Sequence, residues 1–259
     1  MNEMNPTAAT VPPRIPPWPP ASSVPQPLGE NPEEREPIPN VIVALEAILR
    51  QPRRVIYQLR QPGAGKLMLS MVFVTILCSL LYGVVVGTFS KGDQLWAAPA
   101  KICGGMLISA VICLPSLYIF TCLSGSQARL AEICGLVCGL LMLMTLLLIG
   151  FAPVAWLFSE STNSVTWMGT LHLCFWFIST FFGLRFLGAG FSHSQARSSA
   201  GLNLWIIIFL LVVVQMTTAL RPIVGTAKTF LPTEKQFFLT HWTECFNAPT
   251  NNAPPAARE

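Results

Sequence analysis

Five long apolar runs, separated by short polar segments, dominate the hydrophobic pattern of this chain. They cover residues 67–89, 102–123, 133–158, 167–188 and 202–220. Each run has about the length that crosses roughly 30 Å of hydrocarbon as a helix. The runs are continuous, whereas a membrane β-barrel needs short segments that alternate with period two. The pattern therefore predicts an all-α, polytopic membrane protein with five transmembrane helices.

The composition agrees with lipid as the main solvent of the chain. Of 259 residues, 52% are hydrophobic and 11% are charged, whereas about 25% charged residues are usual in a soluble domain. Seven of the eight cysteines fall in the predicted spans, where thiols act as small packing groups, so we expect no disulfide framework. The first span begins too late for a cleaved signal peptide and is expected to remain in the protein.

Basic residues are unevenly divided between the two sides of the predicted bundle. Seven lie on the side of the first approach: Arg53, Arg54, Arg60, Lys66, Arg129, Arg185 and Arg197. Five lie on the other: Lys91, Lys101, Arg221, Lys228 and Lys235. The positive-inside rule then predicts a cytoplasmic amino terminus and an outer carboxyl terminus.

Two segments precede the first span. Residues 1–38 are rich in proline, as in "TVPPRIPPWPP", and we expect a disordered arm that is either a solvated tail or a polyproline ligand anchored by Trp18. Residues 39–66 carry apolar positions at helical spacing, interrupted by Pro52, and predict two short amphipathic helices. These suit the headgroup layer, with Arg53, Arg54, Arg60 and Lys66 as lipid or partner contacts. Packing on the inner face of the bundle is the alternative.

The tail, residues 221–259, predicts one further amphipathic helix at about 233–246, lying on the outer membrane surface or folded back on the bundle. His241, Glu244 and Cys245 share a face of that helix. Three potential ligands in one short helix are insufficient for a metal site, and the roles of His172 and of this helix stay open. We expect no metal and no cofactor.

Several function classes are disfavoured by what the apolar runs lack. They contain no Asp, Glu or Lys, while Arg185 lies near the end of the fourth run and His172 is inside it. Ion-coupled carriers place such charges at membrane depth, and hydrolytic enzymes need a nucleophile with a base or paired acids. "GAGKL" at residues 63–67 lacks the spacing of a phosphate-binding loop. No catalytic residue and no nucleic-acid partner is therefore predicted.

Small residues recur four apart in the predicted spans and favour close helix packing, within the bundle or between copies. They are Gly83, Gly87, Ala131, Gly135, Gly139, Ser179 and Gly183. In the second span, Pro115 of "CLPSLYIFTCLSGS" lacks an amide hydrogen and predicts a kink that frees the carbonyl of Val111. Ser116 or a neighbouring helix is expected to satisfy that carbonyl.

The stretches "LEAILRQPRRVIYQL", "LWAAPAKICGGMLISAVI" and "LPSLYIFTCLSGS", with five spans after a proline-rich arm, resemble Yip1-domain membrane proteins of uncharacterised bacterial type. The likeness covers roughly residues 40–220. It implies a non-enzymatic protein of the bacterial cytoplasmic membrane that acts through partners or the bilayer. The "DLYGP"-type motif that eukaryotic relatives carry before their first span has its nearest echo in "GDQLWAAP", after the first span.

The sequence thus predicts an adaptor or organiser that contacts membrane lipids and other membrane proteins or copies of itself. A channel or uncoupled carrier for a neutral or apolar solute, lined by the kinked second span, is the alternative.

Overall fold

The computed structural model describes residues 27–90, 94–126, 128–162, 164–193 and 200–220. Trp18, Arg197 and the predicted tail helix with His241, Glu244 and Cys245 lie outside these residues. Within them, the secondary structure is helical throughout. Three short helices, α1 (Pro32–Arg35), α2 (Val41–Arg50) and α3 (Pro52–Leu59), precede five long ones.

The five long helices are α4 (Gly65–Ser90), α5 (Gln94–Leu123), α6 (Leu130–Ser161), α7 (Val165–Ser192) and α8 (Ala200–Ala219). All five are long and apolar enough to cross a membrane. The described part of the chain is therefore the five-span helical bundle that the hydrophobic pattern predicts.

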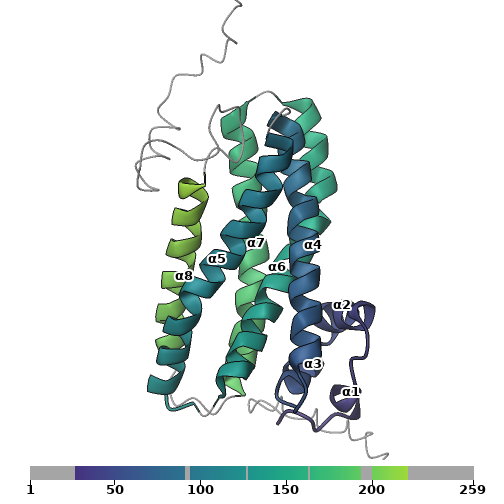
Figure 1. The fold of residues 1–259 in the computed structure, drawn as a ribbon, viewed down its shortest axis with the longest axis vertical. Coiled ribbons are helices and arrows are strands. Elements are labelled where there is room, and N and C mark those ends of the chain that lie inside the picture. The colour runs from purple at the N-terminus through teal and green to yellow at the C-terminus, as the bar shows by residue number, and fades with distance from the viewer. Residues whose placement is uncertain (1–26, 91–93, 127, 163, 194–199, 221–259) are drawn as a thin grey trace, which may run out of the picture.

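Helix α6 is the central element of the bundle. It packs most extensively against α4 and α7, while α5 packs on α4, and α8 packs on α5 at the edge (Figure 1). The largest buried share among the spans belongs to α6, whose interior side chains include Leu136, Leu140, Met144 and Leu148. An apolar helix, rather than a ring of polar side chains, thus occupies the middle of the bundle.

The second span is longer than the apolar run predicts, because α5 begins at Gln94 and not near Ile102. The intervening residues include three alanines, which favour a helix, and Lys101, whose charge suggests a loop in the sequence. Lys101 is instead only 2% exposed, and its aliphatic stem can pack among apolar groups. The span α6 likewise extends over Glu132 and Glu160, so the spanning helices do contain charged residues.

The cap, defined here as residues 27–60, packs against one end of the bundle, which we name the cap end. Helix α2 contacts α4 and α6, and α3 contacts α6 and α7. Their inward side chains are buried: Ala44, Ala47 and Ile48 in α2, and Val55, Ile56 and Leu59 in α3. The cap helices α2 and α3 therefore pack on the bundle through these side chains.

The disorder expected for the proline-rich arm does not extend to residues 27–38. Pro32 begins α1, where a missing amide hydrogen costs nothing, and α1 packs on α3. Composition alone predicted no such structure, because the partners that hold α1 lie some twenty residues further along the chain. A turn at Gly63 (φ 95°) then leads from the cap into α4.

Candidate functional site

The cap is organised around the carboxylate of Glu34, which is 5% exposed. Its Oε2 accepts a hydrogen bond of 2.6 Å from the Gly29 amide, and its Oε1 accepts one of 2.6 Å from Arg53 Nε. Burial raises the pKa of Glu34, but the hydrogen bonds from Arg53 and Gly29 and the Arg53 charge outweigh burial and lower it. Glu34 is therefore an ionised group that holds the segment before α1 to α3.

Gly29 is required at this point for two reasons. Its φ of 86° lies in the left-handed region that favours glycine. A Cβ there would also lie 2.6 Å from Cε2 of the Tyr57 ring. The Gly29 carbonyl in turn accepts a 2.6 Å hydrogen bond from Arg35 Nε, so the turn is held from both sides.

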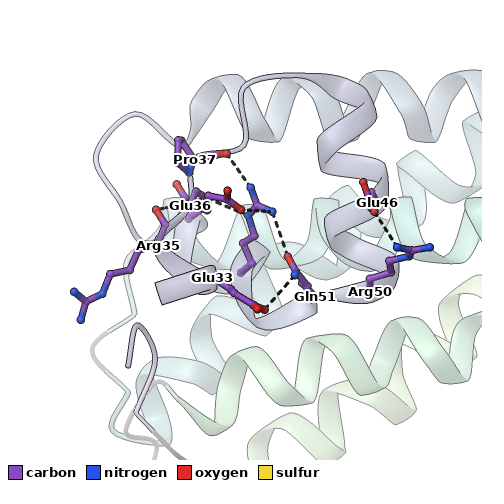
Figure 2. A network of polar contacts seen from close by, with 9 residues as sticks. Glu33, Arg35, Glu36, Pro37, Glu46, Arg50 and Gln51 are labelled. Carbon is purple, nitrogen blue, oxygen red and sulfur yellow. Dashed lines mark hydrogen bonds and ion pairs between the residues drawn. The ribbon is translucent and has the colours of Figure 1, made fainter. Parts of the chain in front are cut away.

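Arg54 binds the residues that directly follow α1. Its guanidinium donates to the carbonyl of Pro37 at 3.0 Å and pairs with Glu36 at 3.2 Å. Figure 2 shows this network, in which Gln51 also points toward Glu33 at 3.4 Å. The segment between α1 and α2 is thus held on α3 by Arg54, while Gln51, the residue before α3, contacts α1 itself.

Arg60 joins the cap to the bundle. Its Nη1 donates 3.0 Å to the carbonyl of His193 at the end of α7, and its Nε lies 3.9 Å from Glu132 in the first turn of α6. A small recess with room for about one water molecule lies beside this pair, lined by apolar groups that include Ile56 and Phe191. Burial, with the charges of Arg53 and Arg60, lowers the pKa of His193.

Three of the four basic residues predicted to contact lipid or partners therefore lie in contacts within the chain. Arg53, Arg54 and Arg60 bind groups of the cap and bundle, whereas Lys66 is exposed at the start of α4. The sequence could not distinguish arginines that bind lipid or partners from arginines that bind acidic groups of the same chain. The local sequence around an arginine is the same in both cases when the acidic group lies about twenty residues away.

The outward side of α2 carries the exposed groups of the cap. Ile42 is 79% exposed and Leu49 is 49% exposed, and both lie on one face because they are seven residues apart. Beside them, Glu46 and Arg50 form an exposed ion pair of 3.1 Å, seen in Figure 2. This face, named here the α2 face, combines two apolar side chains with a charge pair.

The predicted packing glycines lie at close approaches within the chain. A Cβ at Gly83 would meet the backbone of Pro99, and one at Gly135 would lie 2.7 Å from the Leu59 side chain. Gly139 faces the Phe186 ring, and Gly183 would place a Cβ 3.1 Å from the Leu140 carbonyl oxygen. Gly87 and Ser179 are buried and Ala131 is exposed.

Pro115, which is predicted to kink the second span, lies within α5. The carbonyl of Cys113, two residues before it, is in contact with α8. Trp205 Nε1 of α8 donates 2.8 Å to the carbonyl of Cys113, which also accepts 2.8 Å from Ser116 Oγ. From the sequence, such donors are predicted at the carbonyl of Val111, two residues earlier. The only indole buried below 2% exposure in the described chain thus anchors the edge helix α8 on α5.

The polar contact between α4 and α7 was not predicted. Tyr82 Oη and His172 Nδ1 share a 2.8 Å hydrogen bond, and their rings meet edge to face. The opposite nitrogen of His172 is buried with no hydrogen-bond partner in the described residues. The sequence shows a tyrosine and a histidine ninety positions apart, and only packing around α6 brings them together.

Among the residues that the structure describes, no group of three or more His, Cys, Asp or Glu is placed to hold a metal ion. No protein-family model, curated protein or solved structure matches the chain. The resemblance to Yip1-domain proteins stays a prediction.

Proposed function

We propose that this chain is a non-enzymatic integral membrane protein that organises a partner at one membrane surface, using the α2 face of its cap. The observation that carries the proposal is the contrast between the two sides of α2. One side is buried on the bundle at Ala44, Ala47 and Ile48, while Ile42 and Leu49 stay exposed on the other. A helix fixed on one side and apolar on the other suits docking of a second surface.

The rigid attachment of the cap supports the same proposal. Arg60 links α3 to both α6 and α7, and Glu34 holds α1 on α3. The α2 face is therefore presented in one orientation, which lowers the entropy lost when a partner binds. From the distribution of basic residues we place this face in the cytoplasm. The resemblance to bacterial Yip1-domain proteins implies that the membrane is the bacterial cytoplasmic membrane.

Co-purification from native membranes, read by mass spectrometry, tests the proposal. Wild type is compared with a variant carrying Ile42→Ser and Leu49→Ser, and with a control carrying Leu157→Ser and Phe158→Ser. The control residues are exposed and apolar but lie at the far end of α6. We expect specific proteins to be lost from the α2 variant and kept by the control. An unchanged set of co-purified proteins in the α2 variant would falsify the proposal.

A channel or uncoupled carrier for a neutral or apolar solute is the alternative function. The central position of α6, with Leu140 and Met144 buried, favours the organiser, since a pore needs a wet path through the bundle. Flux of small neutral solutes into proteoliposomes, above that of protein-free vesicles, would instead favour the channel.

A further inference from the structure

The side of α7 that faces away from α6 carries a single charge. Ser179, Gly183, Phe186 and Leu187 are buried on the α6 side. The opposite, exposed stripe consists of Ile178, Phe181, Phe182, Arg185, Ala189 and Ser192. At 100° per residue, Arg185 lies about 200° around the helix from Gly183. Its guanidinium therefore belongs to the surface that meets lipid.

Arg185 differs from the charged residues in the cap. No ion pair or hydrogen bond of its side chain occurs in the described part of the chain, whereas Arg53, Arg54 and Arg60 each bind a carboxylate. An arginine on a lipid-facing surface is costly unless it reaches an anion. The local structure thus calls for an anion from outside the described chain.

The depth of Arg185 decides which anion it can reach. The span Trp167–Ser192 has 26 residues, which is about 39 Å of helix against about 30 Å of hydrocarbon. If the excess is shared equally, the Cα of Arg185, seven residues before Ser192, lies about 6 Å below the hydrocarbon boundary. An arginine at that depth can extend its guanidinium to the headgroup phosphates.

The residues beyond Arg185 on the same stripe leave room for that extension. Helical side chains lean toward the amino terminus of their helix, which in α7 points away from the cap end. Arg185 must therefore bend back past the next turns, where the exposed residues are Ala189 and Ser192. The Ser192 hydroxyl is itself bonded to the Ala189 carbonyl at 2.8 Å, so both side chains stay short and close to the helix.

We propose that Arg185 binds the phosphate of an anionic phospholipid in the leaflet at the cap end of the bundle. A guanidinium binds phosphate through two parallel hydrogen bonds. Anionic lipids are favoured over zwitterionic ones because their headgroup carries no cation of its own to compete with the arginine. Phe181 and Phe182, one turn deeper on the stripe, lie where the acyl chains of that lipid would pass.

A carboxylate from a second copy of the chain fits the structure less well. Among the described residues, the acids on the spanning helices are Glu132, which faces Arg60, and Glu160, at the far end of α6. Neither lies on an exposed surface at the level of Arg185. The proposal does not depend on the α2 face and stands or falls separately from the proposed function.

Native mass spectrometry tests this site. The full chain is released from vesicles of equimolar phosphatidylglycerol and phosphatidylcholine, and the ratio of the two lipids that stay bound to it is measured. Wild type is compared with Arg185→Gln, with Arg185→Lys, which keeps the charge, and with Arg129→Gln. Arg129 is a matched control because it is exposed at the same end but precedes the span of α6. We expect Arg185→Gln to lower the preference for phosphatidylglycerol about tenfold, because it removes a direct hydrogen bond to a charged phosphate, whereas the solvated charge of Arg129 is screened by salt.

We expect Arg185→Lys and Arg129→Gln to keep most of the preference. An unchanged preference in Arg185→Gln, or an equal fall in Arg129→Gln, overturns the proposal. If wild type is a dimer, and Arg185→Gln loses the dimer but keeps the lipid preference, the lipid proposal is also overturned. Arg185 would then bind a second copy of the chain. Removing an exposed charge is not expected to impair folding, and thermal unfolding of each variant checks this point.

Discussion

The cap and the spanning bundle hold their helices together by different interactions. In the cap, ionised groups make the specific contacts, as between Glu34 and Arg53 or between Arg54 and Glu36. In the bundle, glycines bring helices close, as at Gly83, and neutral groups form the hydrogen bonds of Trp205 with the Cys113 carbonyl and of Tyr82 with His172.

The difference follows from the solvent around each region. Water drives apolar side chains of the cap onto the bundle, and charged groups can be solvated before they pair. Lipid is as apolar as the helices it surrounds, so the bundle gains mainly from close van der Waals contact. Substitutions that add atoms where two helices approach closely should therefore damage the bundle most, and removal of the Glu34 charge should act mainly on the cap.

The largest effect is expected from Gly83→Leu. A Cβ at this position meets the backbone of Pro99, which cannot move aside as a side chain can. We expect α4 and α5 to separate locally and the free energy of unfolding to fall by about 3 kcal/mol. Gly104→Leu in α5 is the control, because nothing lies within 4 Å of a Cβ there. Denaturant unfolding in detergent that gives equal losses for both would contradict the prediction.

Gly139→Leu and Gly135→Leu come next. The first adds atoms against the Phe186 ring and the second against Leu59, both of which are side chains that can partly shift. We expect losses of about 2 kcal/mol each, larger than that of Cys138→Ala in the same helix. Comparable folded yield and monodispersity for the glycine and cysteine variants would count against close packing at these sites.

Glu34→Gln tests the cap. The substitution removes the charge that pairs with Arg53, and we expect it to cost about 2 kcal/mol of cap stability. Amide hydrogen exchange of α1 and α3 should rise while that of α4 and α6 stays unchanged. A matched control is Glu46→Gln, whose ion pair with Arg50 is exposed and contributes little. Faster exchange throughout the bundle would show that the two regions are not independent.

The cap should also respond to acid. Because the folded-state pKa of Glu34 is lowered from its ordinary value of 4.5, its contribution is full above that pH and is lost as pH falls below it. We expect amide exchange in α1, corrected for the intrinsic pH dependence of exchange, to rise below about pH 4.5 in wild type and to change less in Glu34→Gln. The same rise in both proteins would exclude Glu34 as the titrating group.

The smallest effect is expected from Trp205→Phe. It removes the 2.8 Å hydrogen bond to the Cys113 carbonyl but keeps most of the apolar surface. We expect a loss of about 1 kcal/mol, localised to the contact of α8 with α5. Trp156→Phe, at an exposed position, is the control. Equal thermal stabilities of the two variants would mean that this bond does not anchor α8.

Much of the bundle was predictable from sequence because a spanning helix must satisfy its backbone internally and expose apolar side chains to lipid. Each residue that faces lipid must be apolar wherever it lies in the fold, so the five apolar runs can be recognised directly in the sequence. The ends were less predictable. Lys101 and Glu132 suggest loops by their charge, yet both lie in helices, because a charged side chain can extend or pair without ending a helix.

The cap was predicted only as two helical segments. Periodicity located α2 and α3, but α1 and the turn at Gly29 depend on Glu34 meeting Arg53 nineteen positions away. Such a contact leaves no local signal. For the same reason the sequence assigned Arg53, Arg54 and Arg60 to lipid or partners, while the structure gives them partners within the chain.

The sequence by itself determined that the chain forms five membrane-spanning helices, where Pro115 lies and which small residues are spaced for close packing, since all of these depend on local composition and period. Only the tertiary structure decided that α6 is central, that the cap packs on the bundle, and that Tyr82 meets His172. It also decided that Arg185 faces outward while other arginines are paired. These features depend on which helix faces are brought together, and that is set by packing between segments far apart in the chain.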